Sequence, residues 1–182
     1  MAAAKALREQ GAAVSMTRIA EMSGYGIGTV YEYFPNRASL LCELMHQTCE
    51  DELAAVVTLV PGLRDAPLHV LVERVIGLLV ARADDHRVLT RLVTIEVLPT
   101  LGPEGLEDLM PMAAALLAAE IRGRDTQVVD PDMAARFILI AVEAIVDNAA
   151  MERPQCLAQP DFTRELVALV MGYMMHPRGG AA

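Results

Sequence analysis

The segment spanning residues 15–41 constrains the fold more than any other part of this chain. Its first apolar run stops at Gly24, where a helix C-terminus commonly needs a residue that tolerates positive φ. Apolar and aromatic residues then recur at helical spacing from Ile27 to Phe34, and Pro35 suits the first turn of a further helix. The segment therefore predicts two short helices joined by a glycine turn, which is a helix-turn-helix.

The second short helix is expected to have two different faces. The set expected to face inward is Ile27, Val30, Tyr31 and Phe34, and the outer set is Gly28, Thr29, Glu32 and Tyr33. The outer residues are mostly small or carry hydroxyl groups, so the backbone can approach phosphates and side chains can reach base edges. Arg37 follows at the start of the next helix, where the helix dipole favours an anion such as phosphate.

Several short motifs in this segment form a pattern that is found in a known family. They are Ile19-Ala20, Ser23-Gly24, Gly28-Thr29-Val30-Tyr31, Tyr33-Phe34-Pro35-Asn36-Arg37 and Leu40-Leu41. The pattern covers residues 2–44 and resembles the TetR family of bacterial transcriptional regulators. The remainder matches in its helical architecture and in a Glu-Arg-Pro segment at residues 152–154. The resemblance implies an all-α homodimer with heads that bind palindromic double-stranded operator DNA, and bodies that dimerise and bind a small molecule that releases the DNA.

The resemblance also implies which residues contact DNA. They are Ser15, Thr17 and Arg18 at the first motif helix, Ile27, Gly28 and Thr29 along the recognition helix, Tyr31 and Tyr33 at phosphate or base edges, and Arg37 at a phosphate. Judged by residue type alone, Tyr31 can instead be a core aromatic, and Arg18 can belong to a solvated helix face.

Three features depart from the family pattern. The residues before Gly11 match only the second half of the expected first helix, so this helix is expected to be incomplete. Gly26 stands where a capping Ser or Thr is usual, which costs only about a few tenths of a kcal/mol. Residues 1–50 carry four Lys or Arg residues against five Glu residues. The head is therefore not basic, and its DNA affinity is expected to depend only modestly on salt.

Composition narrows the remaining classes of function. A formal net charge of −9 disfavours nonspecific coating of nucleic acid. The most apolar segment, residues 137–146, contains Glu143 and is far shorter than the roughly 20 residues of a membrane span, so no membrane partner is expected. The three cysteines show no paired spacing, and no signal peptide is evident, which favours the bacterial cytoplasm. No catalytic or phosphate-cradling motif is present, so neither an enzyme nor a cofactor is predicted.

Prolines and glycines divide the rest of the chain into helical segments without strand signals, which predicts an all-α fold. The expected helices span residues 38–60, 68–83, 85–98, 105–122, 132–152 and 161–175, with loops near 61–67, 99–103, 123–131 and 154–160. The expected organisation is a DNA-binding head at residues 1–45, a ligand-binding and dimerisation body at 46–176, and a disordered tail at 177–182.

The expected helix at residues 38–60 has an apolar stripe that changes face along its length, as a connector between head and body requires. Cys42, His46 and Cys49 can share one face of this helix. They are interpreted either as ordinary core residues or as a sensor of metal or oxidant, and no metal site is predicted because a fourth ligand is missing.

The last two expected helices are rich in apolar residues, which suits the four-helix dimer interface that the resemblance implies. The predicted interface residues are Phe137, Val142, Ile145, Val146, Phe162, Leu166, Leu169 and Tyr173. A narrow polar seam of Arg136, Glu143 and Asp147 is interpreted either as a solvated strip or as a pocket lining.

Glu96 shares a helix side with apolar residues and therefore needs a partner, either an internal Arg or His or a cationic or hydroxylated ligand. The predicted ligand-binding residues are Glu96, Leu92, Met110 and Glu143. With no Trp and only seven Phe and Tyr residues, a mostly aliphatic cavity is expected. The alternative function is a dimeric helical module that binds ligands or proteins but not DNA, which the shortened first helix and the acidic head would suit.

Overall fold

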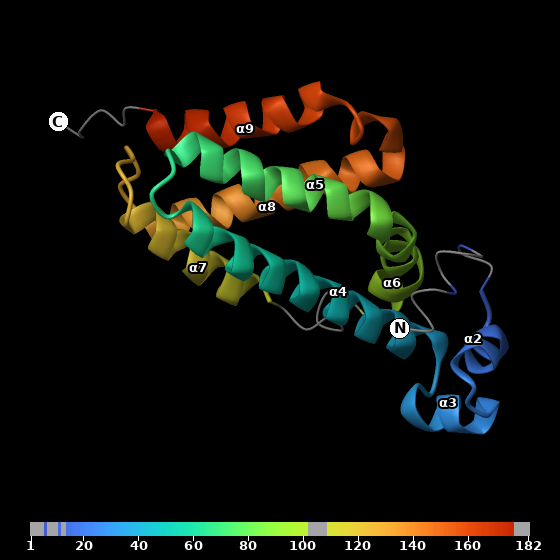
Figure 1. Cartoon of the computed structure of the whole chain (residues 1–182). Helices are drawn as coiled ribbons and strands as arrows, with labels where there is room; N and C mark the ends of the chain where they lie inside the picture. Colours follow the sequence, from blue (N-terminus) through green and yellow to red (C-terminus); the bar gives the residue numbers. More distant parts are fainter. Residues whose placement is uncertain (1–5, 7–10, 12–13, 102–108, 177–182) are drawn as a thin grey trace. The chain divides into compact units, whose positions relative to one another are not determined.

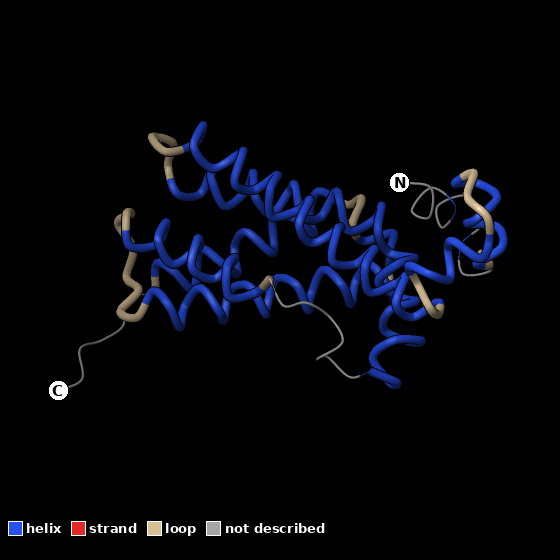
Figure 2. Tube along the Cα trace, turned by 90° about the horizontal axis from the view of Figure 1, so that it is seen from below, coloured by secondary structure: helices blue, strands red, loops and turns tan. Residues whose placement is uncertain are grey.

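The computed structural model describes residues 6, 11, 14–101 and 109–176. Every element in these ranges is helical, with no strand among them, which confirms the predicted all-α fold (Figures 1 and 2). The elements are α2 (Met16–Ser23), α3 (Ile27–Tyr33), α4 (Arg37–Leu59), η2 (Val60–Leu63), α5 (Leu68–Leu92), η3 (Val93–Val97), α6 (Leu98–Leu101), α7 (Met110–Arg122), α8 (Pro131–Glu152), η5 (Pro154–Cys156) and α9 (Pro160–Met175). None of the described helices is long and apolar enough to cross a membrane.

The chain forms two compact units, each built from separate stretches of the sequence. Unit 1 comprises Met1–Asp51 and Asp85–Glu107, and unit 2 comprises Glu52–Asp84 and Asp108–Ala182. Helices α4 and α5 therefore each contribute residues to both units. The predicted boundary at residue 45 remains a prediction, and the predicted tail lies outside the described residues.

The core of unit 1 brings the helix-turn-helix together with the end of α5 and η3. Val14 and Leu41 are almost completely buried there, and so is Val97 of η3. The other buried members are Ala6, Met16, Ile19, Ala20, Val30, Leu40, Leu44, Leu89, Leu92 and Val93. Each buried Leu, Ile or Val contributes about 1.5–3 kcal/mol of hydrophobic free energy, so this shared core holds residues from three stretches of sequence in one unit.

The core of unit 2 centres on the packing of α8 against α7 and α9. Fully buried alanines at 118, 134 and 135 allow α7 and α8 to approach closely. The N-terminus of α8 is capped by Asp130, whose carboxylate accepts hydrogen bonds from the backbone N–H groups of Asp132 and Met133. Pro131 takes the first position of this helix, where its missing N–H has no consequence.

Two predicted boundaries are wrong. The break expected between the helices at 68–83 and 85–98 is absent, because Ala83, Asp84 and Asp85 contain no helix breaker and α5 continues through them to Leu92. The loop expected from residue 99 is also wrong at its start, since Pro99 lies in α6. The helix continues through η3, a π-helical turn in which the Leu98 N–H donates to the Val93 carbonyl. This wider turn precedes the proline ring, which in a regular α-helix would clash with the carbonyl four residues earlier.

Candidate nucleic-acid interface

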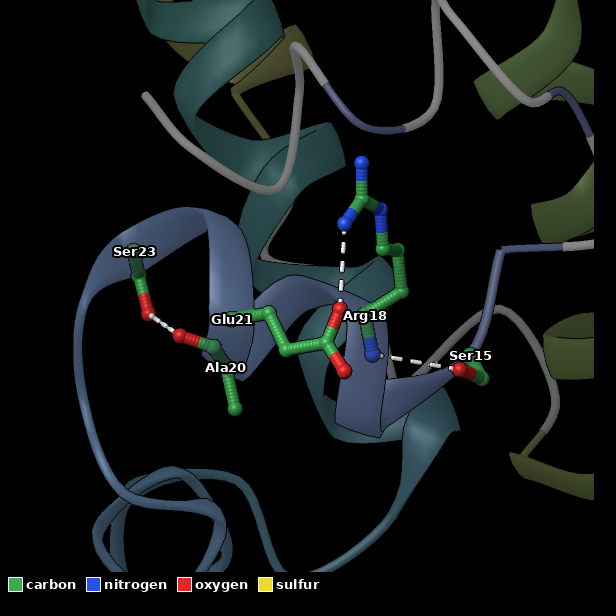
Figure 3. A network of polar contacts seen from close by, with 5 residues as sticks. All are labelled: Ser15, Arg18, Ala20, Glu21 and Ser23. Carbon is green, nitrogen blue, oxygen red and sulfur yellow. Dashed lines mark hydrogen bonds and ion pairs between the residues drawn. The ribbon is translucent and has the colours of Figure 1, made fainter.

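Helix α2 begins and ends as the sequence predicted. The Ser15 hydroxyl caps its N-terminus by accepting a 3.2 Å hydrogen bond from the Arg18 backbone N–H (Figure 3). Gly24 ends the helix with φ of 75°, and its N–H donates to the Glu21 carbonyl. The Ser23 hydroxyl donates to the Ala20 carbonyl at 2.9 Å, which closes the last turn (Figure 3). Helix α2 is therefore bounded by a side-chain cap at its N-terminus and by a left-handed glycine at its C-terminus, where the turn to α3 begins.

Helix α3 is attached to the core through one side only. Val30 is buried and Phe34 is half-buried, as predicted. Ile27 and Tyr31 were also expected to face inward, and this is wrong, because both are exposed and Tyr31 retains 48% of its accessible surface. A helix of seven residues has room for few core contacts, which leaves the other apolar side chains in solvent. The exposed position of Tyr31 does not match the core-aromatic interpretation.

The outer surface of α3 is open. Gly28 is exposed, and a Cβ atom built on it would meet no atom within 4 Å. Glu32 and Tyr33 are exposed as predicted, whereas Thr29 is half-buried. Gly26 begins the helix without a side-chain cap, in agreement with the missing Ser or Thr.

One exposed aromatic residue near α3 was missed by sequence reasoning. Tyr25 lies in the turn between Gly24 and Gly26, and its side chain is exposed. An aromatic residue flanked by two glycines has few neighbours that could cover it, and this was the signal available in the sequence. With Tyr31 and Tyr33, it gives the helix-turn-helix three exposed phenol groups.

Both arginines in the described part of the predicted head are paired with glutamates. Arg18 contacts Glu21 one turn later on α2, at 3.0 Å and on the surface (Figure 3). Arg37 Nε donates to a Glu96 carboxylate oxygen of η3 at 2.9 Å, and Arg37 Nη1 donates to the Val14 carbonyl. The partner that Glu96 requires is therefore an internal arginine, the first of the alternatives raised by the sequence. A phosphate contact of Arg37 remains a prediction.

The four predicted ligand-binding residues divide between the two units. Leu92 and Glu96 belong to unit 1, where Leu92 is buried in the core. Met110 and Glu143 belong to unit 2, where Met110 is half-buried and Glu143 is exposed. Their role in binding a ligand stays a prediction.

Unit 2 contains a polar cluster that sequence reasoning missed in part. Burial raises the pKa of the Glu52 carboxyl to about 7, while Arg82 lowers it and Asp147 and Glu143 raise it. Burial also raises the pKa of Asp147. Arg82 Nε is buried, and within the described residues it has no hydrogen-bond partner. The sequence pattern of α8 indicated a polar seam that contains Glu143 and Asp147. No sequence pattern indicated that Glu52 of α4 lies near this seam.

The predicted dimer residues separate into exposed and buried groups. Phe137 and Leu169 keep about half of their accessible surface, with 54% and 50% exposed, and Ile145 is also exposed. Val142, Val146 and Leu166 are buried in the core of their own chain, so their side chains are not presented to a second copy. Phe162 and Tyr173 are half-buried against the same core. Met133 and Ile140 are also exposed and lie one helical turn before and after Phe137 on α8. The predicted set lacks both residues.

A shallow apolar groove lies at α8 and α9. It measures about 320 Å³ and is lined by Ile145, Phe162, Glu165, Leu166, Ala168 and Leu169. A second groove, of about 580 Å³, is lined by Ala54, Ala55, Thr58, Leu59 and Leu78.

The cysteine and histidine side chains of α4 do not form a metal centre in the structure. Within the described residues, no three His, Cys, Asp or Glu side chains are placed to hold a metal ion. Burial raises the pKa of the Cys42 thiol, which disfavours its reactive thiolate form. His46 Nε2 lies 3.3 Å from a Glu50 carboxylate oxygen. Cys42 also packs against the core of unit 1, as expected for a small apolar residue.

The capped α2, the left-handed turn at Gly24 and the exposed face of α3 define a helix-turn-helix protein with additional helices. Residues 1–44 match the family model described as bacterial regulatory proteins, tetR family. This match confirms the TetR resemblance for the helix-turn-helix segment of the chain.

A solved structure shares the fold over the whole length. It is the fatty acid degradation regulator FadR from Bacillus halodurans, which is 18% identical, with 100% of this chain and 96% of that chain covered at a TM-score of 0.62. At this identity the similarity concerns the fold alone. A comparison with curated proteins gave no match.

Proposed function

We propose that this protein is a homodimeric transcriptional repressor that binds palindromic operator DNA through α2 and α3, and that a small molecule bound by its helical body releases it. The observation that carries the proposal is the exposed face of α3, presented by a capped helix and a left-handed glycine turn within the matched segment. Two heads in a symmetric dimer would read the two half-sites of a palindrome.

The chemistry of this face suits a DNA backbone and the major groove. Tyr25, Tyr31 and Tyr33 present phenol hydroxyls that can donate to phosphate oxygens or meet base edges. Gly28 leaves the helix backbone open to close approach. Ser15 and Thr17 lie at the start of α2, where both are exposed. These residues supply affinity without the cations on which most DNA-binding surfaces depend.

The exposed apolar residues of α8 and α9 supply the proposed dimer interface. Phe137, Ile140, Ile145 and Leu169 are large, exposed and apolar, and Ile145 and Leu169 border the groove between these helices. Apolar area of this kind on a single chain commonly marks an interface. Phe162 and Tyr173 would contribute through their exposed parts.

The residues proposed to contact the effector lie in unit 2. Met110 and Glu143 are the proposed contacts from unit 2, since a flexible thioether and a carboxylate would suit an amphipathic molecule with a cationic or hydroxylated group. Leu92 and Glu96 of unit 1 are engaged in the core and in the Arg37 ion pair, so they would act only after a rearrangement.

A specific observation favours the alternative, a dimeric ligand-binding or protein-interaction module that does not bind DNA. In the described part of the head, Arg18 and Arg37 are both paired with glutamates, which reduces the positive field that attracts DNA.

Binding to the intergenic DNA beside the protein's own gene separates these functions. Fluorescence anisotropy with this duplex and with a scrambled duplex of equal length would be measured across a salt series. Residues 1–50 carry four cations, so eight in a dimer predict a slope of log affinity against log salt no steeper than about −7. Preference for the intergenic duplex, with a slope no steeper than this limit, supports the regulator. A dimer that binds neither duplex would favour the alternative.

A further inference from the structure

Arg37 joins two stretches of unit 1 that are far apart in sequence. Its Nε donates to Glu96 of η3 at 2.9 Å, and its Nη1 donates to the carbonyl of Val14. Val14 immediately precedes Ser15, the residue whose hydroxyl caps α2. The guanidinium therefore connects the π-helical turn to the point where the helix-turn-helix begins.

Both ends of this bridge are anchored in the core. Val93 and Val97, which flank Glu96 in η3, are buried, and Val97 has no accessible surface. Val14 is 1% exposed at the other end. Since these backbones are held by apolar packing, the Arg37 contacts constrain the start of α2 relative to η3 and do not merely neutralise a charge on a mobile side chain.

We propose that Glu96 is a positioning residue for DNA binding, which acts through Arg37 and Val14 to hold the N-terminus of α2 in its binding geometry. The inference rests on the proposed function for its effect on DNA. It assigns to Glu96 a role different from that of a ligand contact, and to Arg37 a role inside the head in addition to any contact with phosphate.

The sign of one substitution distinguishes positioning from electrostatics. Glu96→Ala removes a negative charge from a head that binds a polyanion, so charge alone predicts tighter binding. If Glu96 instead competed with phosphate for Arg37, the substitution would also tighten binding. Positioning predicts the opposite result, because Arg37 loses its charged acceptor and the start of α2 loses its constraint.

The experiment compares wild type, Glu96→Ala and Glu21→Ala by anisotropy with the intergenic duplex at constant salt. Glu21→Ala is a matched control, because it removes one negative charge from the head and breaks an Arg–Glu pair that is local to α2 and exposed. We expect Glu96→Ala to weaken binding about tenfold, the scale of one charged hydrogen bond, and Glu21→Ala to leave it unchanged or tighter. Equal or tighter binding by Glu96→Ala would overturn the proposal.

A double substitution tests whether Glu96 acts through Arg37. In an Arg37→Ala background, Glu96→Ala should cause no further loss, since the bridge is already broken. A further tenfold loss in that background would show that Glu96 acts by another route and would overturn the proposal as stated.

Amide hydrogen exchange of the full chain without DNA keeps the inference testable if the protein binds no duplex. We expect Glu96→Ala to accelerate exchange at the start of α2, including the Arg18 and Ile19 amides, and to leave unit 2 unchanged. Faster exchange throughout the chain would indicate a general loss of stability, and unchanged exchange at α2 would show that the bridge constrains nothing. Either outcome would overturn the proposal independently of the proposed function.

Discussion

Arg124 donates a 2.7 Å hydrogen bond from Nη1 to the backbone carbonyl of Ala66, in the connection between α4 and α5. Its Nη2 donates to the Leu63 carbonyl at 3.0 Å, and its side chain is only 11% exposed. One guanidinium from just beyond the end of α7 therefore satisfies two carbonyls of a turn that is 58 to 61 residues away in sequence. The guanidinium stabilises this turn because it supplies hydrogen-bond donors to backbone carbonyls, as a capping side chain does at the end of a helix.

Arg124→Ala should lower the free energy of unfolding by about 2–4 kcal/mol, because it leaves two carbonyls without their charged donor. Urea denaturation followed by circular dichroism would measure this. Arg164→Ala is the matched control, since Arg164 pairs with Asp161 on the surface of α9, and should change stability very little. Equal losses for the two variants would contradict the role assigned to Arg124.

Stability should depend on pH through Glu52. Its pKa is raised from 4.5 to about 7 in the folded chain, so the folded state binds the proton more tightly than the unfolded state. The favourable contribution is complete below about pH 4.5 and is lost as the pH rises toward 7, by up to about 3 kcal/mol. The raised pKa of Asp147 acts in the same direction.

Glu52→Gln should remove most of this dependence, which urea denaturation at about pH 5 and about pH 8 would test. The exposed Glu73 on α5 provides the control, and Glu73→Gln should retain the loss of stability at the higher pH. A wild-type protein that is more stable at the higher pH would contradict the assignment.

Two glycines of the helix-turn-helix should respond oppositely to a side chain. A Cβ would meet no atom within 4 Å at either Gly24 or Gly26, so sterics with neighbours do not distinguish them. Gly24 has φ of 75°, and Gly24→Ala should destabilise the protein by about 1–2 kcal/mol. Gly26 has φ of −65° and lacks a capping side chain, so Gly26→Ser should be neutral or slightly stabilising. Thermal unfolding of the two variants would check the contrast.

Tyr33 should matter for DNA binding and not for folding. Its side chain is 76% exposed, so Tyr33→Ala should leave the unfolding temperature unchanged. If its hydroxyl reaches a phosphate, the variant should bind the intergenic duplex several-fold more weakly. Unchanged affinity would remove Tyr33 from the proposed interface.

The apolar side of α8 and α9 should determine the oligomeric state. Phe137→Asp and Leu169→Asp each place a charge in the proposed interface and should yield monomers in sedimentation velocity. Val57 is an exposed apolar residue on α4, so Val57→Asp serves as the control and should stay dimeric. Dimers in all three variants would place the interface elsewhere.

Structural features that depend on residues close together in the chain could be predicted from the sequence. Gly24, Pro35 and the apolar spacing predicted the helix-turn-helix and its turn, because caps and breakers act within a few residues. The all-α fold was predicted from the prolines and glycines that end helices and from the lack of strand patterns. The continuous α5 escaped prediction, since an acidic pair at 84–85 resembles the start of a new helix unless the surrounding packing is known.

The helical composition, the glycine turn and the motifs of the head could be derived from the residues alone, because each depends on local backbone preferences. Which side chains meet depends on the packing of segments that are distant in sequence. This packing pairs Arg37 with Glu96 and buries Val142, Val146 and Leu166 in their own chain, while it leaves Ile27 and Tyr31 exposed. Helical periodicity shows which residues share a face, whereas the neighbouring element that covers this face is set by contacts between distant segments.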